Sequence, residues 1–369
     1  MFSFFLKKNS FPIKSILRII HKKIILGKKM FKKNWVGIFI SVTLLFISIE
    51  FRIFNPTLLQ GSRVATFDTY NNFFPRKKSN SPSVLLIDVD ERSLNDHGQW
   101  PWPRSKMASL VENIADMGGL TIGLDMIFAE EDRLSPSNIL QFYPNVSKDI
   151  KNEFLSQPDM DLSFAKAMKS IPVVVGQSGL NFKNTQNHEY SLSSSIEEYK
   201  GKGLDTRPLL IEYSGIVRNI PILEKSSAGR GLISIANEQD GVVRRIPMIA
   251  TYNNQIYPSL TLEMFRVATQ RKPDIVVNEA GIQGVKLRAR HNKNDLFIPT
   301  DSSGNLWVHF ATPYKEWTNN SKEEIYISAT DVLAGKVPRE AFEGKLILIG
   351  TSAIGLKDNK TTPVSIRMP

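Results

Sequence analysis

The chain has 369 residues, no cysteine and a formal net charge of +11, from 47 lysines and arginines against 36 aspartates and glutamates. The lack of cysteine excludes disulfides, thiolate metal sites and cysteine nucleophiles. The five histidines show no metal-ligand spacing, so we expect neither a metal nor a cofactor. Residues 1–34 hold ten bases and no acid, which leaves the rest nearly neutral and makes a nucleic-acid partner unexpected.

The basic tail precedes an apolar run, Trp35–Ile49. Its fifteen uncharged residues fall short of the roughly 17–25 that a spanning helix needs, but the next apolar residues extend it and Arg52 can snorkel. The positive-inside rule therefore predicts a cytoplasmic tail over residues 1–34 and an uncleaved transmembrane signal anchor over residues 35–54. A cleaved signal peptide and a buried core helix are the alternatives.

The tail itself allows two interpretations. Apolar residues recur at helical spacing among its bases, so it could lie as an amphipathic helix on anionic membrane lipid. Alternatively, translation begins at Met30 and residues 1–29 are never made. The apolar stripe consists of Ile13, Ile16, Leu17, Ile20 and Ile24.

Residues 55–79 are predicted to be a polar linker, because they end in basic and Ser/Pro-rich sequence. Beyond residue 80, apolar strands alternate with helices, which predicts an α/β domain with a mainly parallel sheet covered by helices on both faces. Two insertions, Glu130–Pro158 and Asn181–Gly203, are expected to be surface loops. The expected strands are Val84–Val89, Leu120–Phe128, Ile171–Val175, Leu306–Phe310 and Leu346–Ile349.

Three helices are expected between these strands. One starts at Pro103 and ends at Gly118, and another covers Ser259–Gln270. The third, Asp159–Ser170, should turn Leu162, Ala165 and Met168 inward.

An Asp-Gly turn at Asp240 separates two β-like runs, Leu232–Asn237 and Val242–Ala250. Asp-Gly between such runs predicts an antiparallel hairpin appended to the α/β core. Arg244 and Arg245 would then point to opposite faces, so one should meet an acid or the core edge and the other water.

Six motifs occur in one order along the chain, and together they resemble the CHASE type 2 domain. That domain is an extracytoplasmic sensory module associated with bacterial adenylate cyclases, histidine kinases and serine/threonine kinases. The resemblance runs from about Phe67 to the last residue and implies a sensor domain over residues 80–369. The motifs are Val84–Pro103 (VLLIDVDERSLNDHGQWPWP), Gly123–Phe128 (GLDMIF), Asp240–Arg245 with Pro247 (DGVVRR), Tyr257–Leu260 (YPSL), Asp331–Gly335 (DVLAG) and Lys345–Pro363 (KLILIGTSAIGLKDNKTTP).

The chain departs from the family at its C-terminal end. In the family, the Thr-Pro pair is followed by membrane helices and an output domain, whereas this sequence stops at Pro369. The resemblance therefore implies a receptor sensor truncated or split from its cyclase or kinase output. A separate transmitter protein or a second copy of the chain would be its partner.

Asp88, Asp90 and Asp125 are the first candidate site residues. They lie near the carboxyl ends of predicted parallel strands, where α/β sheets place ligands. The carboxylates could bind a cation or a basic ligand. The alternative is that they accept backbone N–H bonds from adjoining turns and order the strand ends.

Trp100, Trp102 and Arg104 are the next candidates. The two indoles could form an aromatic binding platform, or they could pack as a lid over the sheet edge. Arg104 falls in the first turn of a helix, where a cation opposes the helix dipole. That conflict predicts a carboxylate partner, such as Asp125 or Asp358.

The loop after the last predicted strand supplies Gly350, Thr351 and Ser352. Its glycine spacing is that of a P-loop, but Leu356 replaces the required lysine, and Ile354 stands where a nucleophile elbow needs glycine. Its backbone N–H groups could still bind an anion. The alternative is a close-packed turn.

Together these observations predict a single-pass protein of the bacterial inner membrane whose sensor domain faces the periplasm or the outside. Its partners would be membrane lipid and an unidentified extracytoplasmic ligand, and the chain itself would not be an enzyme. Two alternatives stay open: an anchored enzyme that uses the three aspartates, and a scaffold that docks other proteins.

Overall fold

The computed structural model describes residues 35–54, 57–77, 82–184, 205–235, 238, 240–289, 294–311, 325–353 and 360–368. The chain divides into two compact units, Met1–Asp68 and Thr69–Pro369. Asp358 and most of the insertion Asn181–Gly203 lie outside the described residues.

The first unit contains helix α2 (Trp35–Phe54) and the start of helix α3 (Thr57–Phe73). Every side chain of α2 from Trp35 to Glu50 is exposed. Within the described residues, no helix has both the length and the apolar character required to cross a membrane. The segment predicted to be a linker contains α3.

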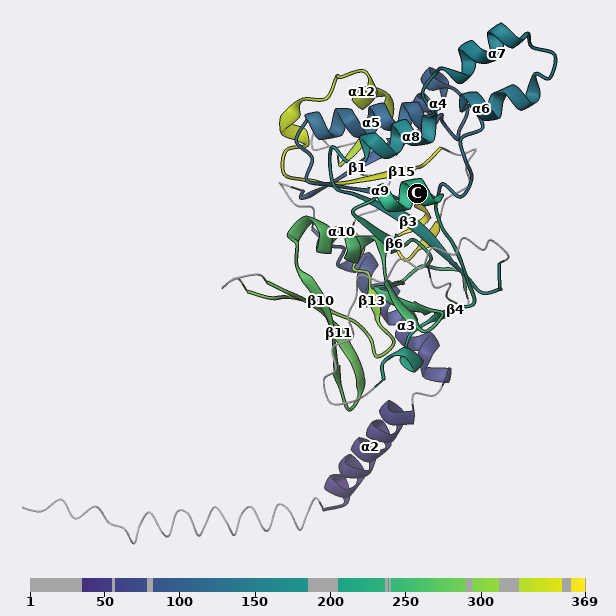
Figure 1. Cartoon of the computed structure of the whole chain (residues 1–369). Coiled ribbons are helices and arrows are strands. Elements are labelled where there is room, and N and C mark those ends of the chain that lie inside the picture. The colour runs from purple at the N-terminus through teal and green to yellow at the C-terminus, as the bar shows by residue number, and fades with distance from the viewer. Residues whose placement is uncertain are drawn as a thin grey trace, which may run out of the picture. The chain divides into compact units, whose positions relative to one another are not determined.

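The second unit is built on one sheet (Figure 1), whose described strands run parallel except for the last. Strand β15, from the far end of the sequence, lies between β1 and β2, so the centre of the sheet forms only when distant segments meet. The prediction of a mainly parallel α/β sheet is confirmed. In order across the sheet, the strands are β14 (Tyr326–Ser328), β1 (Val84–Val89), β15 (Leu346–Thr351), β2 (Thr121–Leu124) and β3 (Val173–Leu180), which pairs with parallel β6 (Gly229–Leu232) and antiparallel β5 (Gly215–Val217).

Helices cover both faces of this sheet. Along β15, Ile347 and Ile349 belong to the core under α5 and α8, whereas Leu346 and Leu348 pack with α10 on the other face. This period-two alternation of buried side chains is what a strand covered on both sides requires. The first face carries α4 (Glu91–His97), α5 (Arg104–Asp116), α8 (Met160–Ala167), α9 (Pro221–Ser226) and α12 (Ala329–Leu333), and the second carries α10 (Leu260–Thr269) (Figure 1).

Smaller sheets, mostly antiparallel, complete the unit. In the β8–β9 hairpin, Asn253 and Asn254 take φ values of 48° and 60°, the left-handed conformation that a tight two-residue turn needs. The sheets are β4 (Glu212–Tyr213), β8 (Ile249–Tyr252) and β9 (Gln255–Pro258); β10 (Lys272–Asn278), β11 (Gly281–Arg288) and β12 (Leu296–Pro299); β7 (Arg245–Pro247) with β13 (Asn305–Trp307); and β16 (Lys360–Thr362) with β17 (Ser365–Met368).

The hairpin predicted around Asp240 is wrong. The turn exists, with Gly241 at φ 74° and its N–H donating to the Glu238 carbonyl, but the described residues on its two sides pair with other strands. Strand β6 forms its hydrogen-bonded ladder with β3 in the central sheet, and β7 forms its ladder with β13. Both partners are distant in sequence from the turn. The antiparallel hairpins of the domain lie elsewhere in the sequence.

Both arginines after this turn meet acids, whereas the sequence predicted water for one of them. The buried guanidinium of Arg244 donates to both carboxylate oxygens of Asp240, at 2.9 and 2.7 Å. Arg245 donates to Glu238 at 2.7 Å. The pKa of Asp240 falls to about 2, chiefly because the Arg244 guanidinium stabilises its charged form.

Helix α8 corrects a further prediction. Ala165 and Met168 are buried as expected, but Leu162 is 58% exposed and Phe164 takes its place in the core. Asp159 caps the helix by accepting the Leu162 N–H, which sets the helical phase. The insertion Glu130–Pro158, expected to be a loop, contains α6 (Pro136–Ile139), η1 (Leu140–Phe142) and α7 (Lys148–Leu155); the other short 3₁₀ turns are η2 (Arg207–Leu209) and η3 (Arg339–Ala341).

Candidate functional site

Three neighbouring strands end side by side at the carboxyl edge of the central sheet. Asp88 of β1 is in register with Gly350 of β15, and the Asp125 N–H donates to the Ile349 carbonyl at 2.9 Å. Asp88, Gly350 and Asp125 therefore follow one another across the sheet. Among the described residues, a Cβ on Gly350 would meet only the Asp125 Cβ, at 3.9 Å. The two aspartates thus flank a backbone position that has room above it.

Asp88 is half-buried and accepts a hydrogen bond of 2.5 Å from the Ser352 hydroxyl. Burial raises the pKa of its carboxyl group, and the negative charge of Asp90 adds to this effect, whereas the Ser352 hydrogen bond opposes it. Asp125 is exposed. Thr351, the last residue of β15, lies opposite Val89 in the same register. The edge is therefore acidic, and one of its acids is held by the Ser352 hydroxyl.

Asp90 caps helix α4. Its Oδ1 accepts the Ser93 N–H at 2.8 Å and the Ser328 hydroxyl at 2.9 Å. This carboxylate thus orders the turn after β1, which is the structural alternative for the acids at this edge.

The two tryptophans occupy different environments. Trp102 is 1% exposed, and its indole N–H donates to the Gly98 carbonyl at 3.0 Å. Trp100 is only partly buried, and its ring centroid lies 5.8 Å from that of Trp102. The peptide bond between Trp100 and Pro101 is cis. Trp102 therefore packs in the core, as the packing alternative requires, and leaves Trp100 as the accessible indole.

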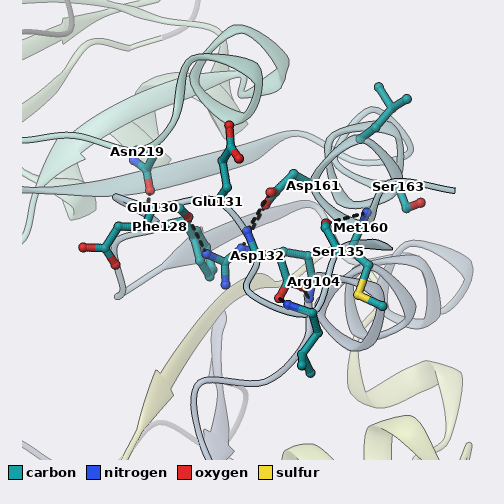
Figure 2. Close-up of polar contacts among 12 residues, drawn as sticks. Arg104, Phe128, Glu130, Glu131, Asp132, Ser135, Met160, Asp161, Ser163 and Asn219 are labelled. Carbon is teal, nitrogen blue, oxygen red and sulfur yellow. Dashed lines mark hydrogen bonds and ion pairs between the residues drawn. The ribbon is translucent and has the colours of Figure 1, made fainter. Parts of the chain in front are cut away.

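Arg104 lies in a buried polar cluster (Figure 2), in which it meets the loop after β2 and the start of α8. Its Nε lies 3.3 Å from Asp161 Oδ1, and its backbone N–H donates to Asp132 at 2.6 Å. The guanidinium also donates to the Glu130 carbonyl at 3.1 Å and lies over the Phe128 ring, 4.3 Å from its centroid. One arginine thus joins three segments of the chain.

The two aspartates of this cluster also hold each other. The Asp132 N–H donates to Asp161 at 2.8 Å, and the other Asp132 oxygen accepts the Leu134 N–H at 2.9 Å. Burial raises the pKa of Asp161 against the opposing effects of the Asp132 N–H and the Arg104 charge, and burial lowers the pKa of Arg104. The cluster is a structural joint with buried charges on both sides.

The predicted carboxylate partner of Arg104 is therefore present but is a different residue. Asp161 and Asp132 occupy that role, whereas the sequence suggested Asp125 or Asp358. The reason is topological: α8 packs against α5 and carries Asp161 in its first turn. An acid in the first turn is ordinary in any helix, so no sequence signal distinguished Asp161.

Sequence reasoning also missed a polar contact between α4 and α12. The buried Thr330 hydroxyl lies 2.8 Å from Asp96 Oδ2 and 2.8 Å from His97 Nε2. A catalytic triad would place the acid on the imidazole, whereas here both groups meet the hydroxyl. This contact links two helices, and the described residues contain no group of three or more potential metal ligands.

The described domain is thus an α/β fold with acids at the carboxyl edge of its sheet, where such sheets place their ligands, and with paired polar clusters elsewhere. Comparison with protein families agrees: the CHASE2 domain family matches residues 40–369, and the chain belongs to this family. CHASE2 is a sensory domain family. No curated protein and no solved structure matches the chain.

Proposed function

We propose that the chain is the membrane-anchored, extracytoplasmic sensor of a bacterial receptor, and that its ligand binds at the carboxyl edge of the central sheet. The observation that carries the site is the row formed by Asp88, Gly350 and Asp125 across three parallel strands. The adenylate cyclase or kinase output would lie outside these residues, on a transmitter protein or a partner chain. The chain itself acts by binding.

The proposed anchor is the segment 35–54, in the inner membrane. Two features support it: the side chains of α2 from Trp35 to Glu50 are exposed and mostly apolar, and ten bases with no acid precede them. Membrane lipid would cover the apolar side chains, and the positive-inside rule would keep residues 1–34 in the cytoplasm.

Signalling would be conformational. A cationic ligand between Asp88 and Asp125 would favour whichever arrangement of β1, β15 and β2 places the two carboxylates best. Asp90 caps α4 directly after β1, so a shift at this edge would reach the helices on the first face.

Topology reporters test the orientation. Fusions after Lys29 and at Gly203 should report the cytoplasm and the periplasm, respectively. A Gly203 fusion that is active only in the cytoplasm contradicts the proposal.

Thermal unfolding tests the ligand site. We expect Ca²⁺ or the diamine putrescine to raise the melting temperature of the full chain saturably, and Asp125→Asn to abolish that rise. Glu112→Gln, which changes an exposed acid on α5, is the matched control. The carboxyl-edge site is wrong if neither probe gives a saturable rise, or if the Asp125 and Glu112 variants respond alike.

A protein-docking scaffold is the second candidate, because the η1–α7 segment exposes large apolar side chains. Phe142, Tyr143, Ile150, Phe154 and Leu155 are all exposed, and α7 lies away from the central sheet in Figure 1. Such patches favour protein contacts. The measurement is sedimentation of the full chain: self-association that Phe142→Ser together with Phe154→Ser removes would support the scaffold, and a concentration-independent monomer would count against docking to a second copy.

A further inference from the structure

A group of arginine and tyrosine side chains lies where the edge of the central sheet meets the sheet β4–β8–β9. Leu232 of edge strand β6 forms a parallel bridge with Ser259, which follows β9. Gly231 permits this approach, because a Cβ there would meet the backbone of α10 at 2.4 Å. Arg230 lies two positions before Leu232, and Tyr257 lies two positions before Ser259. The parallel register of this bridge therefore places Arg230 and Tyr257 side by side on one face.

Tyr257 is 7% exposed, and its hydroxyl accepts a hydrogen bond of 3.2 Å from Arg218 Nη2. The Arg218 guanidinium also lies 5.8 Å from the centroid of the Tyr252 ring, which contacts Tyr257 edge-on. Burial raises the pKa of Tyr257, and the positive charges of Arg218 and Arg230 both oppose that rise. Two cations therefore act on one buried hydroxyl group.

Arg230 makes an incomplete set of contacts. Its Nη1 is buried and has no hydrogen-bond partner among the described residues, although Glu224 Oε2 lies 3.8 Å away. Glu224 is held in place, since its other oxygen accepts the Gln177 side-chain N–H at 2.7 Å and the Asn219 N–H at 3.2 Å. The Arg230 side chain is 24% exposed. Its guanidinium thus reaches from a buried acid to solvent with an N–H still to be satisfied.

We propose that Arg218, Arg230 and Tyr257 form a binding site for a small oxyanion, the carboxylate or phosphate group of a small-molecule ligand. Guanidinium groups recognise both anions with paired hydrogen bonds. The Tyr257 hydroxyl donates to Gln255 Oε1 at 3.4 Å and would turn from this long hydrogen bond to the anion. The anion would meet the solvent-facing part of the Arg230 guanidinium, while Nη1 keeps facing Glu224 Oε2. The site is separate from the acidic carboxyl edge, and it gives the YPSL motif a role through the Tyr257 hydroxyl.

The position of this site gives the ligand a way to change the structure. Arg230 belongs to the central sheet, whereas Tyr252 and Tyr257 belong to the β4–β8–β9 sheet. An oxyanion bridging them would favour the arrangement in which the two sheets are close.

The test uses the full chain with inorganic phosphate and with acetate as probes, at an ionic strength held constant with chloride. Isothermal titration and thermal unfolding should show saturable binding of one of them. We expect Arg230→Gln and Tyr257→Phe each to weaken binding at least tenfold. Arg271→Gln removes a cation between the end of α10 and the start of β10, and this variant should bind like the unmodified protein.

Binding of phosphate or of acetate supports the site and identifies which oxyanion the ligand carries. The proposal is overturned if the unmodified protein binds neither probe saturably, or if the Arg230 and Arg271 variants bind equally. Tyr257→Phe keeps every charge and removes one oxygen atom, so it tests the site even if Arg230→Gln fails to fold. Asp125→Asn should leave oxyanion binding intact, which distinguishes this site from the carboxyl edge.

Discussion

The Arg104 cluster and the carboxyl edge of the central sheet both gather aspartates, but they treat the negative charge differently. In the cluster, Asp161 is 6% exposed in its side chain and faces a guanidinium and a backbone N–H. At the edge, Asp88 is half-buried and faces the Ser352 hydroxyl, while Asp125 is exposed. A paired buried charge fixes the fold, whereas a carboxylate held by a hydroxyl group keeps its capacity for a proton or a cation.

Removing the cation of the buried cluster should have the largest effect. Arg104→Gln leaves Asp161 buried without its counter-charge, so we expect the free energy of unfolding to fall by about 3–5 kcal/mol. Urea unfolding of the full chain measures this. The double variant Arg104→Met with Asp161→Leu should recover most of the loss, because it removes both charges. A loss below about 1 kcal/mol for the single variant would mean that the cluster is not a structural joint.

The pair formed by Asp240 and Arg244 is intermediate between the buried cluster and the sheet edge, since its acid is half exposed although its arginine is buried. Asp240→Asn should cost only about 1 kcal/mol at pH 7, because water screens the half-exposed carboxylate and the amide oxygen can still accept from Arg244. The pKa of Asp240 in the folded protein is about 2, below its ordinary value of 3.8. Its contribution is therefore complete above pH 3.8 and is lost as the pH falls through about 2. Unfolding curves at pH 2, 4 and 7 should show this acid-dependent contribution in the unmodified protein and not in the variant.

Asp88→Asn should have the opposite sign. Because burial raises the pKa of Asp88, the folded state holds this proton more tightly than the unfolded state, and stability declines as pH rises through the folded pKa. Replacing the carboxyl group with an amide removes that cost, so stability at pH 7 should stay equal or rise by less than about 1 kcal/mol. Destabilisation by more than that amount would place Asp88 with the structural acids.

Ser352→Ala should give the smallest change in stability, about 0.5–1 kcal/mol at pH 7. Its sharper readout is the Asp88 carboxyl group, whose pKa should rise further once the hydrogen bond that stabilises its charged form is gone. Carbon-detected NMR titration measures the shift. An unchanged pKa would show that Ser352 does not control this carboxylate.

The sequence predicted elements well where local signals and tertiary packing agree. Strand β1 has the predicted bounds, and Ser259 caps α10 where the helix was expected to start, because its side chain accepts the Leu262 N–H. The edge aspartates were predicted near the carboxyl ends of parallel strands, where the structure places Asp88 and Asp125. The motifs predicted the CHASE2 family, and the match over residues 40–369 confirms membership.

The failures share one physical cause, the choice of a partner distant in sequence. The strong turn signal at Asp240 predicts a turn, but it does not determine which strands pair on either side. The partner of Arg104 comes from α8 and not from the strand ends. Phe164 is buried at the position in the core that was predicted for Leu162. The Arg230–Tyr257 pair depends on a single bridge between β6 and the residue after β9. No periodic pattern in the sequence predicts that bridge.

The hydrogen bond from the Asn72 side chain to the Pro363 carbonyl, 3.0 Å long, ties the last turn of α3 to the β16–β17 hairpin. Nearby, the buried Asn71 accepts the Phe310 N–H at 3.0 Å. The first and last segments of the sensor unit are thus hydrogen-bonded to each other. A domain whose first and last segments lie together can be inserted into a longer polypeptide without stretching that polypeptide.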